Sequence, residues 1–177
     1  KLIEELPDIA FPRTETMYNN FLLSCYFVGQ LQPHEIVPLY QSLLQDIPDV
    51  ADKTIIKTNL SIFYIQIGDL ESAGRLLTEM RDSLLESRAY EPSCLYHIEA
   101  NLVALSLYKG DWALAQSHLQ SLDILIPNMD RSSYYVKKHA VLEQIIRERI
   151  TFPDDLESVV LKVCPTFQTS AWNYFGR

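Results

Sequence analysis

Long apolar runs, glycines and basic residues are all scarce in this sequence, and each shortage excludes a class of protein. The longest apolar stretches, such as Ser61–Ile65, fall far short of the roughly 20 residues that a membrane-spanning helix needs. Lys and Arg number 15 against 23 Asp and Glu, which gives a net charge of −8. Because nucleic acids and anionic membranes are held largely by Lys and Arg, we expect this chain to bind neither.

The motifs of common catalytic and cofactor sites are also missing. The five glycines form no Gly-rich phosphate-binding loop, and neither a C-x-x-C pair nor an H-E-x-x-H motif occurs. Cys94 and His97 form a single C-x-x-H pair that no second pair accompanies. No nucleophile, base and orienting group have a spacing that predicts catalysis. We therefore expect a protein that is not an enzyme and has no metal, no cofactor and no catalytic residues.

Cysteine is scarce as well. Cys25, Cys94 and Cys164 are odd in number, widely spaced and next to bulky or apolar neighbours. This pattern favours buried free thiols in a reducing compartment over a disulfide framework. At the beginning of the chain, acidic residues such as Glu4 and Glu5 interrupt any apolar stretch, so no secretory signal is predicted. We expect a cytoplasmic protein.

What the sequence does contain is a helical pattern that ends three times in glycine. Apolar and aromatic residues such as Leu60 and Phe63 recur at three- and four-residue steps before Gly68. Similar segments precede Gly29 and Gly110, and the three glycines lie about 40 residues apart, the length of two helices and two short turns. Because 47% of the residues are hydrophobic, such helices can bury a core between them.

A second helical segment follows each of these glycines. Asp69 and Asp111 come directly after the second and third glycines and can cap the helix that follows. Ala73 and Ala115 lie five residues after the same glycines, and we expect these small residues where two helices approach closely. In the first unit, we expect Pro33 to interrupt the second helix.

The order of an aliphatic residue, an aromatic residue, Gly-Asp, a bulky residue and alanine resembles the tetratricopeptide repeat. The resemblance covers about residues 15–125 and implies an all-α fold, a right-handed α-solenoid of antiparallel helix pairs with about three to four repeats. Domains of this family commonly bind peptides or other proteins. The matching residues are Leu60, Tyr64, Gly68, Asp69, Leu70 and Ala73 in the second repeat, and Leu102, Gly110, Asp111, Trp112 and Ala115 in the third.

Three segments are predicted along the chain. Residues 1–13 are expected to be a linker or the end of a preceding unit. Residues 14–150 hold the tetratricopeptide-like repeats, with a fourth unit that begins after residues 128–130 and is helical to its end. Residues 151–177 are expected to hold a capping helix, Leu156–Val163, because the last unit of a stack otherwise exposes an apolar face. The aromatic tail after that helix predicts a continuation into an unseen region of a longer protein.

An asparagine recurs nine residues before each of the three glycines, as Asn20, Asn59 and Asn101. Asn is a mediocre helix former, so its recurrence at one helical position suggests a role for the amide. The resemblance to peptide-binding tetratricopeptide domains implies that the three amides line a concave face and hydrogen-bond the backbone of an extended peptide. The alternative is that they form hydrogen bonds between neighbouring helices.

Residues at three- and four-residue steps from these asparagines share their helix face and are the expected walls of the groove. In the fourth unit His139 takes the aligned position, and Lys138 beside it gives the groove a basic end that can receive a ligand carboxylate. The alternatives are that Lys138 is a solvated surface charge and that the apolar wall residues belong to the core. Besides the asparagines, the predicted binding residues are Phe27, Ile62, Gln66, His97, Tyr108, Lys138 and His139.

These observations predict a non-catalytic module of a larger regulatory protein that binds an extended peptide or a protein in a concave groove. One specific form is suggested by a resemblance to bacterial cytoplasmic receptors for signalling peptides, which have degenerate repeats with helical asparagines. The alternative is a sensor or scaffold segment that packs on sister domains of a multidomain signalling protein, such as a signalling ATPase or a transcription regulator. The flanks of helical stacks often form dimers, so a homodimer is a further candidate assembly.

Overall fold

The computed structural model describes residues 14–46, 50–87, 92–129 and 134–150, and within these ranges every regular element is a helix. The predicted all-α class is confirmed. The expected linker at residues 1–13 and the expected capping helix within residues 151–177 lie outside the described residues. The elements are α1 (Thr14–Phe27), α2 (Pro33–Asp46), α3 (Val50–Gln66), α4 (Leu70–Ser87), α5 (Pro92–Tyr108), α6 (Trp112–Leu125), the short 3-10 helix η1 (Ile126–Asn128) and α7 (Tyr134–Glu148).

Glycine turns connect α1 to α2, α3 to α4 and α5 to α6, as the sequence predicts. Gly68 and Gly110 have φ values of +80° and +70°, a left-handed conformation that costs other residues about 1–2 kcal/mol. At each turn two backbone N–H groups donate back to carbonyls of the preceding helix, for example from Gly110 to Leu107 and from Asp111 to Ser106. The predicted caps also form, since the Asp111 carboxylate accepts the N–H of Leu114 at 3.0 Å.

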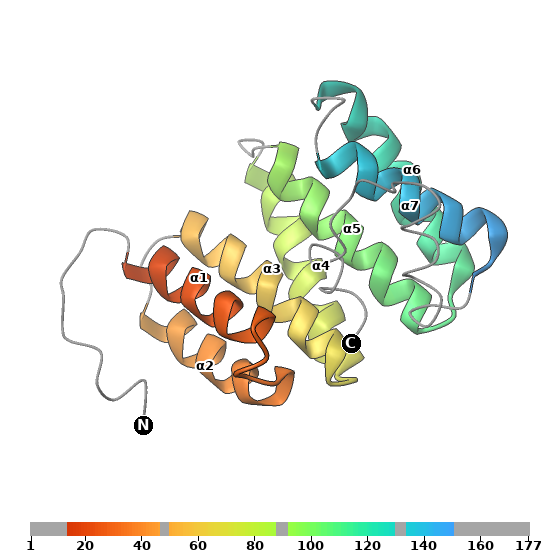
Figure 1. The fold of residues 1–177 in the computed structure, drawn as a ribbon. Helices are drawn as coiled ribbons and strands as arrows, with labels where there is room; N and C mark the ends of the chain where they lie inside the picture. The colour runs from red at the N-terminus through yellow and green to blue at the C-terminus, as the bar shows by residue number, and fades with distance from the viewer. Residues whose placement is uncertain (1–13, 47–49, 88–91, 130–133, 151–177) are drawn as a thin grey trace.

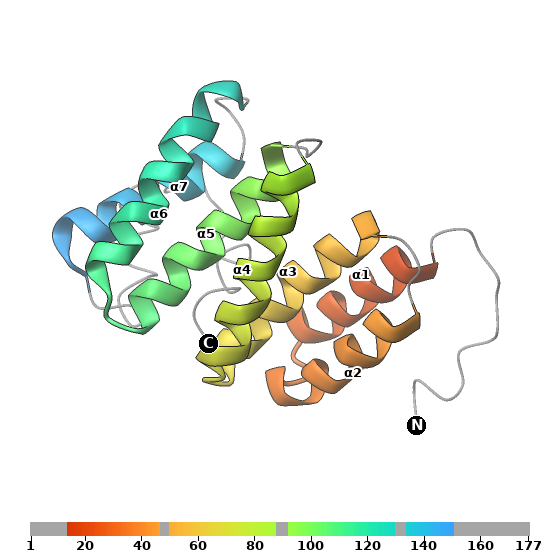
Figure 2. The same cartoon turned by 180° about the vertical axis from the view of Figure 1, so that it is seen from behind.

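The helices pack mainly on their neighbours in sequence (Figures 1 and 2). The helices α1 and α2 lie at one end of the domain, and α6 and α7 lie at the other. Figure 1 views the side on which α1, α3, α5 and α7 follow one another, whereas α4 and α6 face the viewer in Figure 2. Contacts between α1 and α3, between α3 and α5, and between α5 and α7 run along the first side.

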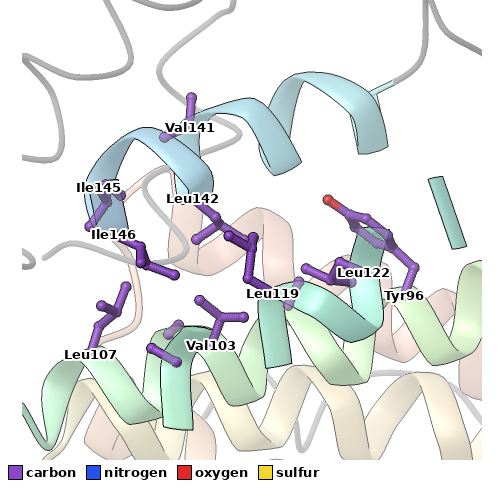
Figure 3. Close-up of a cluster of buried hydrophobic side chains, with 12 residues drawn as sticks. Tyr96, Val103, Leu107, Leu119, Leu122, Val141, Leu142, Ile145 and Ile146 are labelled. Carbon is purple, nitrogen blue, oxygen red and sulfur yellow. The ribbon is translucent and has the colours of Figure 1, made fainter. Parts of the chain in front are cut away.

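Three clusters of buried apolar side chains hold the helices together, and each cluster joins one helix pair to the first helix of the next. The first cluster, from α1, α2 and α3, includes Tyr40 and Phe63, whose ring centroids are 5.5 Å apart. The second cluster joins α3, α4 and α5 and contains Ala73, which is fully buried as expected of a close helix contact. In the third, Leu142 and Ile146 of α7 point toward α5 and α6 (Figure 3).

Two predictions about the helix boundaries have different outcomes. The expectation that Pro33 interrupts a helix is wrong, because α2 begins at this residue. Proline is accepted in the first turn, where its missing N–H has no helical partner. The side chain of Glu35 closes the same turn by accepting the backbone N–H of Gln32 at 2.8 Å. The predicted helix of the fourth unit is confirmed as α7.

Candidate binding pocket

A pocket of about 410 Å³ opens between α3, α5 and α7, the helices on the side seen in Figure 1. Its walls combine hydroxyl, amide and thiol groups with aliphatic and aromatic side chains, a mixture that suits a ligand with both polar and apolar parts. The lining residues are Thr54, Ile55, Thr58, Asn59 and Ile62 from α3, Ser93, Cys94, His97 and Asn101 from α5, and Tyr134, Tyr135 and Lys138 from α7.

Lys138 is the most buried cation of this pocket, with 3% of its surface exposed. Its ammonium nitrogen lies 5.7 Å from the centroid of the Tyr134 ring, within the range of a cation–π contact. His97 lies opposite on α5, with its ring centroid 6.4 Å from that of Tyr134 and 5.3 Å from that of Tyr135. The α7 end of the pocket therefore combines one buried amine, placed against the Tyr134 ring, with the neighbouring rings of His97 and Tyr135.

Burial perturbs the protonation of these groups. Desolvation lowers the pKa of Lys138 from the usual 10.5 to about 7. The pKa of His97 is lowered to about 4, first by desolvation and then by the positive charge of Lys138. Desolvation also raises the pKa of Tyr134 above its ordinary value of 10, and its phenol is neutral at pH 7 in either case. Near pH 7 the only net charge that these three side chains carry is a partly protonated Lys138.

The three recurring asparagines differ in their surroundings. The Asn59 side-chain amide donates to the Asn19 carbonyl oxygen on α1 at 2.8 Å. Asn101 is 1% exposed, and its amide donates to the Thr58 backbone carbonyl on α3 at 3.4 Å. Both asparagines line the pocket and form the inter-helix bonds that the alternative interpretation expected. Asn20 is exposed and does not line the pocket.

The pocket brings together Asn59, Asn101, Ile62, His97 and Lys138 of the predicted binding residues. The other five lie elsewhere. The imidazole of His139 is 2.7 Å from the Asp123 carboxylate on α6. This contact directs the imidazole toward α6 and away from the pocket. Four further predicted binding residues do not line the pocket. One is Asn20, and the others are Phe27, Gln66 and Tyr108, the last residues of α1, α3 and α5.

Several lining residues were not predicted, although their spacing carries a signal. Thr54, Thr58 and Ile62 follow at four-residue steps, so they form one stripe of α3. On α7, Tyr134 and Lys138 have the same spacing. Searching for such polar and aromatic stripes, rather than counting from the glycines alone, would have found this face.

Comparisons with protein-family models, with characterised proteins and with solved structures find no match to this chain. Within the described ranges, no group of three or more His, Cys, Asp or Glu side chains is placed to hold a metal ion. None of the helices described in the structure combines the length and the apolar content needed to cross a membrane. Of the cysteines, Cys25 is buried and Cys94 is partly buried in the pocket, and neither forms a disulfide with another described residue. Cys164 lies outside the described residues.

Proposed function

We propose that this chain is a non-catalytic binding module, a right-handed stack of tetratricopeptide-like helix pairs that holds a segment of another polypeptide in the pocket between α3, α5 and α7. The observation that carries the proposal is the composition of the pocket, which polar groups from three helices line together with the aliphatic side chains of Ile55 and Ile62. A polypeptide segment offers the matching groups, because its backbone presents N–H and C=O groups and its side chains fill apolar space.

The repeat architecture is supported by the recurring turns and cores. Gly-Asp turns close α3 and α5 with the same backbone hydrogen bonds, about 40 residues apart. Each buried cluster joins a helix pair to the first helix of the next pair, which is how repeat proteins bury the apolar face that one unit leaves open. The first helices α3, α5 and α7 then jointly supply the binding surface.

Lys138 indicates where the ligand carries its negative charge. Its ammonium group lies beside the Tyr134 ring and lines the pocket, so a ligand carboxylate that enters there can form a charge-assisted hydrogen bond with it. The other titratable groups of the pocket are His97, Cys94, Tyr134 and Tyr135. Because Lys138 must be protonated to pair with a carboxylate and has a pKa of about 7, ligand affinity should fall as the pH rises above 7.

A selection from a random peptide library tests the proposal. Selected peptides are titrated by calorimetry into the wild type and into two matched variants, Ile55→Glu and Ile124→Glu. Both isoleucines are exposed, at 52% and 74%, but only Ile55 lines the pocket. We expect Ile55→Glu to weaken binding about tenfold or more and Ile124→Glu to leave it unchanged.

Two outcomes would contradict this function. If the selected peptides bind both variants as tightly as they bind the wild type, they use another surface. If the library yields no binder at all, the chain is better described as a sensor or scaffold segment that packs on sister domains.

A further inference from the structure

One face of α1 is exposed although its counterparts on α3 and α5 are buried. Counted from the glycine that ends each helix, Met17, Phe21 and Ser24 occupy equivalent positions to Ile56, Leu60 and Phe63, and to Ile98, Leu102 and Leu105. We call these positions the stacking stripe. On α3 the stripe packs on α1 and α2, and on α5 it packs on α3 and α4. On α1 it faces solvent, with Met17 59% exposed.

The recurring asparagines show the same difference between α1 and the later helices α3 and α5. Asn59 and Asn101 adjoin the stripe, and each donates to the first helix of the preceding pair. Asn20 has the equivalent position on α1 and is exposed. The α1 surface therefore has both the apolar side chains and the amide that the later helices use to contact a neighbouring helix.

Charge is absent from this surface. Between Thr16 and Pro33 the sequence contains no Asp, Glu, Lys, Arg or His, whereas the whole chain has a net charge of −8. Val28 extends the apolar area just past the helix, with 69% of its surface exposed. Two copies with a charge of −8 repel each other over most of their surfaces, and this face is one across which they can approach without juxtaposing like charges.

We propose that the α1 face, formed by the stacking stripe with Asn20 and Val28, is the interface of a homodimer in which the α1 helices of two copies pack on each other. The α1-to-α1 arrangement is self-complementary, because each copy presents the same neutral apolar surface, and it closes after two subunits. This inference goes beyond the proposed function and is independent of it, since no α1 residue lines the pocket.

Light scattering coupled to size-exclusion chromatography tests the proposal on the full chain over a range of concentrations. The wild type is expected to reach twice the monomer mass of 20.4 kDa. The double variant Met17→Glu, Phe21→Glu should remain at the monomer mass, because it places four carboxylates in the interface. The matched control is Leu85→Glu, which replaces an apolar residue of α4 that is 47% exposed and should dimerise like the wild type.

Other outcomes would overturn the proposal. A wild type that stays monomeric at the highest concentration would show that α1 is covered by another protein or by other residues of this chain. Masses that grow beyond the dimer would indicate end-to-end stacking. Circular dichroism of the double variant separates a lost interface from a lost fold, and if it is unfolded, the single variant Phe21→Glu replaces it. A folded double variant that still dimerises would exclude α1 as the interface.

Discussion

Replacing Lys138 with Met should stabilise this protein. The amine has a pKa of about 7 in the folded chain and an ordinary value of 10.5 in the unfolded chain. Between these values the unfolded chain binds a proton that the folded chain has released, so the stability contributed by this group rises with pH and is lost as the pH falls through 7. Met keeps the length of the apolar stem and removes the amine.

The size of the effect follows from the two pKa values. At about 1.4 kcal/mol for each pH unit between them, burial of the protonated amine costs at most about 5 kcal/mol at low pH. Lys138 lines a pocket that water can enter, which reduces the penalty. We therefore expect Lys138→Met to raise the free energy of unfolding by about 3 kcal/mol at pH 6. At pH 9 the difference should shrink to about 2 kcal/mol, because the folded chain then holds a neutral amine and the remaining cost is that of releasing its proton below the ordinary pKa of 10.5.

Urea unfolding followed by circular dichroism at both pH values measures these differences. Lys137→Met is the matched control, because it removes the same charge at a neighbouring, more exposed position of α7. Its stability difference from the wild type should be small and equal at the two pH values. The reasoning is refuted if Lys138→Met lowers the stability at pH 6, or if its stability difference from the wild type does not change between pH 6 and pH 9.

Three further variants test single contacts of the fold by urea unfolding. Asn101→Ala should cost about 1 kcal/mol, because it removes two long hydrogen bonds to α3, and unchanged stability would show that these bonds contribute nothing. Gly68→Ala should cost about 1–2 kcal/mol from its φ of +80° alone, since an added Cβ would meet no atom within 4 Å; a more stable variant would contradict this. His118→Ala should cost about 3–5 kcal/mol, because it leaves the buried Glu99 carboxylate, 2.8 Å from the imidazole, without its partner, whereas replacing both residues with Leu should recover most of that loss.

The helix pairs could be predicted from the sequence because their signals are local. A glycine with a left-handed backbone and an aspartate that caps the next helix act within a few residues, and both recur at the turns after α3 and α5. The error at Pro33 has a local cause as well. Proline breaks the interior of a helix but is favoured in its first turn, and the sequence pattern did not fix where α2 begins.

The pocket could be predicted only in part, because side-chain direction depends on which helices lie beside each face. Counting from the glycines gave Asn20, Asn59 and Asn101 the same helical position, but Asn20 has no described helix on that side to contact. Its neighbour Asn19 is buried and accepts hydrogen bonds from Tyr40 and Asn59. His139 and Lys138 were both predicted to line the groove, but of the two only Lys138 lines the pocket. Asp123 of α6 holds the His139 imidazole on the other side of α7.

On α5 the apolar residues that stabilise the stack lie on other faces than the pocket residues, and Asn101 has both roles. The side chains of α5 are buried over almost the whole helix from Leu95 to Leu107, as expected of an element with neighbours on all sides. The face toward α4 and the face toward α6 and α7 are mainly apolar, with the Glu99–His118 pair between α5 and α6 as an exception. In contrast, His97 and Asn101 point to the pocket. Apolar packing on two faces stabilises α5 enough that the third face can hold polar groups that cost free energy. A buried lysine on the adjoining α7 is tolerated for the same reason, because the apolar cluster that includes Leu142 anchors that helix independently of the amine.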